Sequence, residues 1–110
     1  MSSADASEKI EISVLVPVMN EAGNIRPLMD EIAAAFAGRA FEILYIDDGS
    51  TDSTAQELEE ARAVIPQLRV LSHEIRSGQS AALRSGLFAS RGDIIAVLDG
   101  DGQNIPADFA

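Results

Sequence analysis

The stretch IIAVLDGDGQN, residues 94–104, decides both the fold and the site that the sequence predicts. Its first five residues are apolar, which predicts a buried strand from Ile94 to Leu98. Two carboxylates follow at once, Asp99 and Asp101, and each is followed by a glycine that lets the backbone turn sharply. Alternate carboxylates on such a turn offer the oxygen ligands that a hard divalent cation prefers. The stretch therefore predicts a strand that ends in a metal site.

Strand-like and helix-like segments alternate along the rest of the chain. Apolar runs predict the strands, and apolar residues at helical spacing or helix-start signals predict the helices between them. The strands are too apolar to have one face in water, so the order β-α-β-α-β-α-β predicts an open parallel α/β sheet with helices on both faces. The predicted strands cover residues 10–18, 41–46, 68–71 and 94–98, and the predicted helices cover about 25–36, 53–65 and 78–89.

Polar pairs follow three of these strands. In parallel sheets of this kind, ligands bind beyond the carboxyl ends of the strands. Asn20-Glu21, Asp47-Asp48 and the pair Asp99 and Asp101 all have this placement, and no acidic residue of the predicted helices has it. For Asn20-Glu21, a plain role in capping the first helix is an equally good interpretation.

Asp47 and Asp48 have no evident structural role in the sequence. Asp52 and Ser53 already serve the start of the next helix, and Ser53 with Gln56 forms a capping-box pattern. Carboxylates at such a turn commonly accept hydrogen bonds from a ribose or a base. We therefore favour nucleoside binding for Asp47 and Asp48 over a simple helix start.

Two basic residues near the third predicted helix have weaker signals. His73 is the single histidine, follows a strand and has no evident partner, so we expect a structural or exposed residue and not a catalytic base. Arg76 precedes the helix and could face a phosphate, although an exposed arginine is the commoner case.

Composition limits the possible classes of function. The net charge of −10 argues against binding to nucleic acid or to anionic lipid. No apolar run approaches the ~20 residues that span a bilayer, and the absence of cysteine excludes thiolate metal sites. Residues 1–9 read as a flexible tail, and residues 10–110 as the nucleotide-binding half of a larger domain.

Alternative classes of site fit the sequence less well. An EF-hand would need glycine where Asn104 stands. A phosphatase-like α/β domain could use Asp99 as nucleophile and Asp101 as acid and base, but that arrangement expects the pair after the first strand. A non-catalytic phosphoacceptor module would need a lysine after a later strand, whereas Lys9 is the single lysine.

Four motifs, in order, resemble the family 2 glycosyltransferases, and in particular their polyprenyl-phosphate (dolichol-phosphate) hexosyltransferase members. The resemblance covers nearly the whole chain after Lys9. The motifs are VPVMNEAGNI (16–25), ILYIDDGSTDST (43–54), RSGQSAALRSGL (76–87) and DIIAVLDGDGQNIPAD (93–108).

The resemblance implies a GT-A fold and a nucleotide sugar donor of the GDP-mannose or UDP-glucose type. It implies transfer of the hexose to a polyprenyl phosphate at the cytoplasmic face of a membrane, with Mg²⁺ or Mn²⁺ at the diphosphate. A catalytic base would lie beyond Ala110, so residues 1–110 alone are not expected to catalyse transfer. The predicted nucleotide-binding residues are Pro17, Glu21, Asp47, Asp48 and Asp99, and the predicted metal ligands are Asp99, Asp101 and Gln103.

Overall fold

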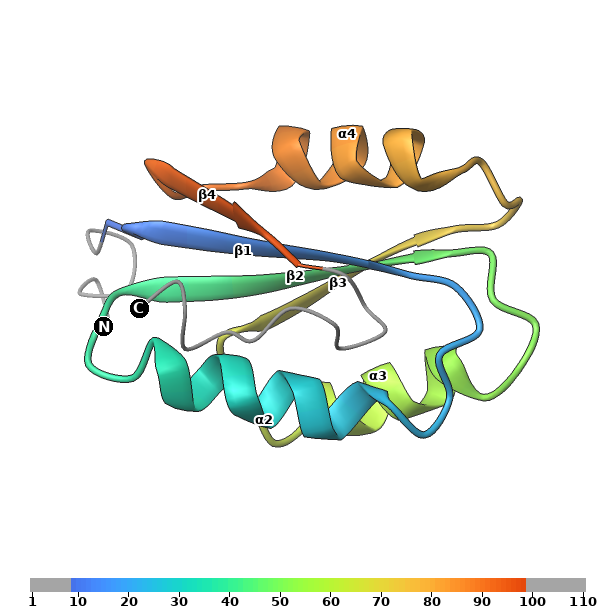
Figure 1. Ribbon diagram of the computed structural model, residues 1–110, viewed down its shortest axis with the longest axis horizontal. Coiled ribbons are helices and arrows are strands. Elements are labelled where there is room, and N and C mark those ends of the chain that lie inside the picture. The colour runs from blue at the N-terminus through green and yellow to red at the C-terminus, as the bar shows by residue number, and fades with distance from the viewer. Residues whose placement is uncertain (1–8, 99–110) are drawn as a thin grey trace.

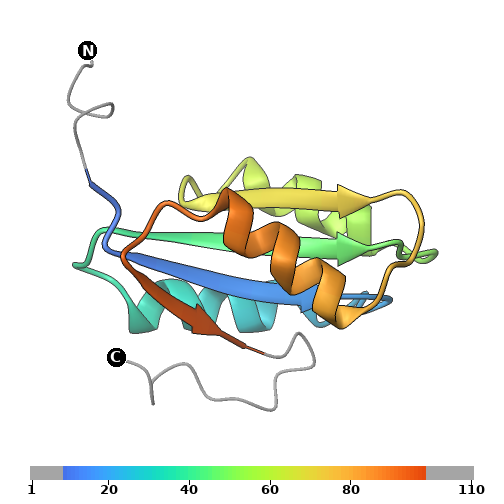
Figure 2. The ribbon, with the colours of Figure 1, turned by 90° about the horizontal axis from the view of Figure 1, so that it is seen from above.

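A computed structural model describes residues 9–98, and residues 1–8 and 99–110 lie outside the described part. The strands form one parallel sheet in the order β3-β2-β1-β4 (Figure 2). Helix α4 covers one face, and α2 and α3 cover the other (Figure 1). The predicted α/β class is therefore confirmed. The elements are β1 (Ile12–Val18), α2 (Ile25–Ala35), β2 (Phe41–Asp48), α3 (Thr54–Arg62), β3 (Leu68–His73), α4 (Gln79–Ala89) and β4 (Ile94–Val97).

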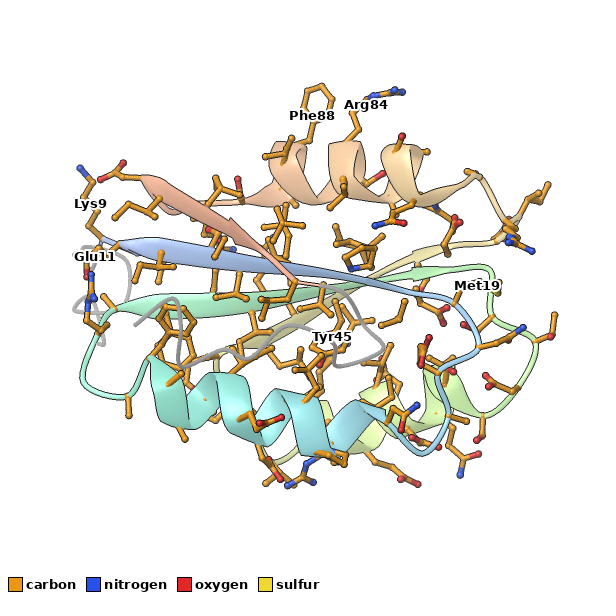
Figure 3. The ribbon with its side chains drawn as sticks, in the orientation of Figure 1. Lys9, Glu11, Met19, Tyr45, Arg84 and Phe88 are labelled. Carbon is orange, nitrogen blue, oxygen red and sulfur yellow. The ribbon has the colours of Figure 1, made fainter. Side chains whose placement is uncertain are left out.

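The larger core lies between the sheet and the pair α2 and α3. Every residue of β2 is buried, because this central strand has neighbours on both edges and helices on both faces. The predicted apolar stripe of α2 is confirmed, with Ile25, Leu28, Met29 and Ile32 buried. Tyr45 points into this layer from β2 (Figure 3), where burial raises the pKa of its hydroxyl. That hydroxyl has no hydrogen-bond partner among residues 9–98.

The core under α4 is smaller and depends on close approach. Its buried members are Leu15, Leu44, Ile46 and Ala82. A Cβ atom on Gly86 would lie 2.9 Å from Ile46 Cδ1 and 3.0 Å from Leu15 Cδ2. The small residues of α4 therefore let the helix backbone pack directly on the sheet.

Strand β4 differs from the prediction. The sequence predicts a buried strand, but Ile94, Ile95 and Val97 are 51%, 37% and 42% exposed, and Ala96 is the buried member. The reason is its place at the edge of the sheet, beside β1, while α4 packs over β1, β2 and β3. An apolar run cannot by itself distinguish an edge strand from a central one.

The boundaries of two strands also differ from the prediction. Strand β2 continues beyond Ile46 through Asp47 and Asp48, and β3 continues beyond Leu71 to His73. The two extensions pair with each other, because Asp47 lies opposite Ser72 and Asp48 opposite His73. The polar residues after the apolar runs are therefore held in the sheet and are not part of loops.

Helix α3 does not begin with the predicted capping box. Ser53 makes no capping hydrogen bond, and its Oγ donates instead to Glu57 Oε2 at 3.1 Å. The Thr54 N–H donates to Asp52 Oδ1 at 2.9 Å, and Gln56 Nε2 donates to Glu60 at 3.3 Å. Asp52, two residues before Thr54, thus takes the backbone donor at this helix start in the manner of an Asx turn.

A buried polar network fixes the connection from α4 to β4. Glu42 is 3% exposed, and its Oε2 accepts hydrogen bonds from Ser13 Oγ at 2.6 Å and from Arg91 N–H at 2.7 Å. Its Oε1 accepts from Arg69 Nη1 at 2.8 Å, and the same nitrogen donates to the carbonyl of Ala89. Burial raises the pKa of Glu42, but the bonds from Ser13, Arg69 and Arg91 outweigh it and hold the pKa below its ordinary value.

We expect Glu42→Ala to lower the free energy of unfolding by ~2 kcal/mol, because it leaves Arg69 without its partner and removes two further bonds. This loss of stability is smaller than that expected for a fully buried ion pair, because the Arg69 side chain is 31% exposed. Urea denaturation measures the change. The control is Glu31→Ala on the exposed side of α2, expected within ~0.5 kcal/mol of the parent. Equal effects of the two substitutions would contradict a stabilising role for the network.

Candidate functional site

The turns after β1 and β2 are joined at the carboxyl edge of the sheet. Successive backbone N–H groups from Asn20 to Gly23 donate to side chains that follow β2. Asn20 donates to Ser50 Oγ at 2.9 Å, and Glu21 donates to Thr54 Oγ1 at 2.9 Å. Ala22 donates to Asp52 Oδ2 at 3.2 Å, and Gly23 donates to the Glu57 carboxylate at 3.0 and 3.1 Å. The first turn is therefore placed by the second.

Asn20 supports this join from its own side. Its φ of 57° is left-handed, a conformation that asparagine tolerates better than most residues. Its side-chain Oδ1 accepts the N–H of Thr51 at 2.8 Å, and Glu21 Oε1 accepts from Asn24 Nδ2 at 3.2 Å. These partners lie outside the first turn of α2, so neither side chain accepts a backbone N–H of that helix. The polar turn at Asn20-Glu21 thus serves the placement of the loops.

Asp47 and Asp48 leave β2 toward opposite faces of the sheet, as neighbours in a strand must. Both are 4% exposed. Asp47 Oδ1 accepts the N–H of Ser50 at 3.1 Å, in the turn toward α3. Asp48 Oδ1 accepts the N–H of Ser77 at 2.9 Å, and Oδ2 accepts that of Gly78 at 2.8 Å, just before α4. The expectation that the pair has no structural role is therefore wrong.

His73 completes the environment of Asp48. Its Nδ1 lies 2.8 Å from Asp48 Oδ1, and its Nε2 lies 2.9 Å from Ser85 Oγ on α4. A carboxylate can only accept, so Nδ1 donates to Asp48, while Nε2 and the Ser85 hydroxyl form the second hydrogen bond of the ring. The expectation of no partner is wrong, whereas the expectation of a structural residue agrees with these contacts. The sequence signal for these contacts is the spacing of His73, two residues beyond Leu71, because alternate residues of a strand share a face and Leu71 packs under α4.

The order Ser85, His73, Asp48 is that of a hydrolytic triad, but the setting does not fit one. Ser85 lies within α4, where backbone N–H groups donate along the helix and do not converge on a reacting carbonyl. A shallow groove of about 430 Å³ lies beside these residues. Its lining is Leu71, Ser72, His73, Ser85, Phe88 and Ala89. We therefore interpret the three residues as a link from α4 to the sheet.

The net effect of these contacts is to keep Asp48 ionised. Burial raises the pKa of Asp48, but hydrogen bonds from Ser77, His73 and Gly78 outweigh burial and hold the pKa below its ordinary value of 3.8. The carboxylate also lies at the start of α4, where the helix dipole favours negative charge.

Gly49 lets the β3–α4 loop approach the end of β2. Its φ is 76°, and a Cβ atom there would lie 2.7 Å from Arg76 N and 3.2 Å from Ile75 C. The backbones of the two turns are thus in direct contact. Arg76 itself is exposed, in line with the commoner case for an arginine.

The predicted site residues are only partly brought together. Pro17 is half-buried on β1, in register with Ile46, and it shares the α4 face of the sheet with Asp48. Glu21 lies near Thr54, beyond the end of β1, where Met19 marks the turn (Figure 3). Asp47 points to the α2 and α3 face. Pro17 and Asp48 therefore share one side of the sheet edge, and Asp47 lies on the other.

The predicted metal ligands Asp99, Asp101 and Gln103 lie outside the described residues. Within residues 9–98, no group of three or more histidine, aspartate or glutamate side chains could hold a metal ion. The described chain ends at Leu98, whose N–H donates to Leu15 O at 3.0 Å. Strand β4 therefore runs parallel to β1 toward the edge that carries the turns described above.

Comparison with known proteins identifies the family. The family model described as glycosyl transferase family 2 matches residues 13–110. The chain belongs to this family. It is 37% identical to a dodecaprenyl-phosphate galacturonate synthase of Rhizobium johnstonii, over 96% of the chain and 32% of that protein. It is 34% identical to the dolichyl-phosphate beta-glucosyltransferase ALG5C of Trichomonas vaginalis, over 86% of the chain and 30% of that protein. The chain thus spans about a third of the length of these relatives.

Solved structures agree with this assignment. A mannosyltransferase of Pyrobaculum calidifontis in complex with GDP-Man and Mn²⁺ superposes with a TM-score of 0.76 and 26% identity, over 86% of the chain and 28% of the other. S. aureus TarS 1-349 in complex with UDP-GlcNAc superposes with a TM-score of 0.74 and 29% identity, over 84% of the chain and 27% of the other. The predicted GT-A fold is confirmed over the matched part.

Gly49→Ala should destabilise the protein more than the same change at Gly38. Both glycines have a left-handed φ, 76° and 88°, which costs an alanine ~1 kcal/mol. Only the Cβ at Gly49 would meet backbone atoms, and this overpacking adds ~2 kcal/mol. Urea denaturation of the two variants measures the difference. Equal losses of stability would contradict the close approach of the two turns.

Asp48→Asn should lower the stability by ~2 kcal/mol at pH 7, because the amide cannot replace a charged acceptor of three bonds. The folded-state pKa of Asp48 is lowered, so its contribution is present above the unfolded pKa and is lost as the pH falls through the folded pKa. The difference between parent and variant in urea denaturation should therefore shrink as the pH falls below the ordinary pKa range of an aspartate. Asp30→Asn, an exposed control on α2, should change little at any pH. A gap that stays constant from pH 7 to pH 2 would show that the charge is not responsible.

Proposed function

We propose that the protein transfers a hexose from a nucleotide diphosphate sugar to a polyprenyl phosphate. The observation that carries the proposal is the match to glycosyl transferase family 2 from residue 13 to residue 110. The relatives named above act on dodecaprenyl or dolichyl phosphate, and a further relative, 38% identical over 89% of the chain, is an undecaprenyl-phosphate 4-deoxy-4-formamido-L-arabinose transferase of Pseudomonas aeruginosa. The mannosyltransferase neighbour holds GDP-Man and Mn²⁺. Together these support a sugar donor with a lipid-phosphate acceptor.

In this proposal the nucleotide lies across the carboxyl edge of the sheet. Its contacts come from Pro17, Glu21, Asp47, Asp48 and Asp99. The turn that carries Glu21 is placed by four backbone hydrogen bonds, and the turn at Gly78 is placed by Asp48. Both turns are therefore positioned before a ligand binds, which reduces the entropy cost of binding.

The proposed ligands of Mg²⁺ or Mn²⁺ are Asp99, Asp101 and Gln103. The donor set fits such an ion, since it consists of carboxylate and amide oxygens. When bound, the ion stabilises the negative charge that develops on the departing nucleoside diphosphate. The chain's own part is to orient the nucleotide through the two placed turns. The proposal assigns no residue of this chain as the catalytic base.

The proposed place of action is the cytoplasmic face of a membrane, where a polyprenyl phosphate would present its head group. Within residues 9–98 no helix has the length and apolar character needed to cross a bilayer. The phosphatase-like alternative is not favoured, because the Asp-x-Asp pair follows the fourth strand of the chain and the family match is to glycosyltransferases.

Calorimetric titration of UDP and GDP, with and without Mn²⁺, tests the proposal. At least one nucleotide should bind, and Mn²⁺ should strengthen its binding. Asp101→Asn should remove the effect of Mn²⁺ and leave the metal-free affinity in place. Asp93→Asn, which changes an exposed acid paired with Lys9, is the control and should behave as the parent. Equal heats with and without the metal in the parent would contradict the metal role.

A further inference from the structure

We propose that the outward surface of α4 binds an anionic lipid bilayer. This α4 surface consists of six exposed residues of the helix and its two flanking connections: Ile75, Arg76, Arg84, Leu87, Phe88 and Arg91. The inference goes beyond the proposed function, because it concerns how the domain docks and not what it transfers. The choice of a bilayer over a protein partner rests on the proposed function, whose acceptor is a membrane lipid.

Large apolar side chains are exposed on α4 and beside it. Phe88 is 87% exposed, Leu87 is 52% exposed, and Ile75, shortly before the helix, is 78% exposed. Arg84 precedes Phe88 by four residues, about one helical turn, and both side chains point away from the sheet (Figure 3). A helix that faces only water carries polar residues on this side. Apolar side chains gathered there indicate a surface that meets a partner.

The basic residues fall into two groups according to their partners. Within residues 9–98, five of them form ion pairs with carboxylates: Lys9, Arg26, Arg39, Arg62 and Arg69. No salt bridge in that part of the chain includes Arg76, Arg84 or Arg91. These three are the basic members of the α4 surface. Positive charge without a carboxylate partner therefore coincides with the exposed apolar side chains.

The net charge of −10 does not describe this surface, because the acidic residues lie elsewhere. Residues 75–92 contain three arginines and no aspartate or glutamate. The acids on either side of them are Glu74 and Asp93, and Asp93 is paired with Lys9. Helices α2 and α3, on the opposite face of the sheet (Figure 1), carry the exposed acids Asp30, Glu31, Glu59 and Glu60. A negatively charged surface therefore attracts the α4 side and repels the other side.

An anionic bilayer suits both kinds of side chain on the α4 surface. Its lipid phosphates attract arginine, and its interfacial region accommodates aromatic and aliphatic side chains. Arginine can reach the head groups while Leu87 and Phe88 enter the boundary of the acyl chains. The α4 side then faces the membrane, and α2 and α3 face away from it.

Co-sedimentation with sucrose-loaded vesicles tests the role of charge. The chain should bind vesicles of phosphatidylcholine and phosphatidylglycerol, and should bind vesicles of phosphatidylcholine alone much more weakly. Arg84→Gln combined with Arg91→Gln should weaken binding to the mixed vesicles about 25-fold, because each arginine at such a surface contributes about fivefold. The matched control is Arg26→Gln combined with Arg62→Gln, which changes the net charge equally on the opposite side. It should weaken binding by about twofold at most, because salt screens distant charges.

Tryptophan fluorescence tests which side of the domain meets the bilayer. The chain contains no tryptophan, so a single introduced tryptophan reports on its own position. With mixed vesicles, the emission of Phe88→Trp should shift to shorter wavelength and should be quenched by brominated lipids. The control is Val64→Trp, just after α3, where the parent side chain is 62% exposed. It should show neither change.

The outcomes separate this inference from the proposed function. Equal losses of binding for the two double variants would overturn the inference, because net charge alone would then explain the binding. Equal quenching of the two tryptophan variants would overturn it as well. A parent chain that binds neither kind of vesicle would also overturn it, in favour of a protein partner for the α4 surface. The vesicle measurements use no nucleotide, so they can fail while UDP or GDP still binds in calorimetry.

Discussion

The buried carboxylate of Asp48 is the interaction on which the carboxyl edge of the sheet depends. A charge with 4% exposure is tolerated because three donors surround it, from β3 and from the two residues before α4. The carboxylate therefore determines where α4 begins and how the turn after β3 approaches the turn after β2.

Helix α4 is held at both ends by carboxylates of the same strand. Asp48 lies at the start of α4, where the helix dipole favours a negative charge. Glu42 lies near the end of α4, where the dipole disfavours an unpaired negative charge. Arg69 resolves the second case, since it pairs with Glu42 and donates to the Ala89 carbonyl at the helix end. The small apolar core under α4 is thus supplemented by polar contacts at both ends.

The turns at the carboxyl edge of the sheet are linked by hydrogen bonds, whereas the strand at the border of the sheet, β4, is partly exposed. The turns after β1, β2 and β3 are joined by backbone hydrogen bonds to side chains, which suits them to receive a nucleotide with little rearrangement. Strand β4 lies at the other side and keeps 51% of Ile94 and 42% of Val97 exposed. In the sequence, the proposed metal ligands Asp99, Asp101 and Gln103 follow this less covered strand.

The sequence by itself determined the order of elements, the parallel sheet with helices on both faces and the apolar stripe of α2, because these follow from local periodicity. It also carried the family motifs. Only the tertiary structure decided the partners of Asp48, His73 and Glu42, since their contacts join residues 12 to 49 positions apart and periodicity carries no information about such pairs. The exposure of β4 was likewise decided by strand order, because the same apolar run can occupy the centre or the edge of a sheet.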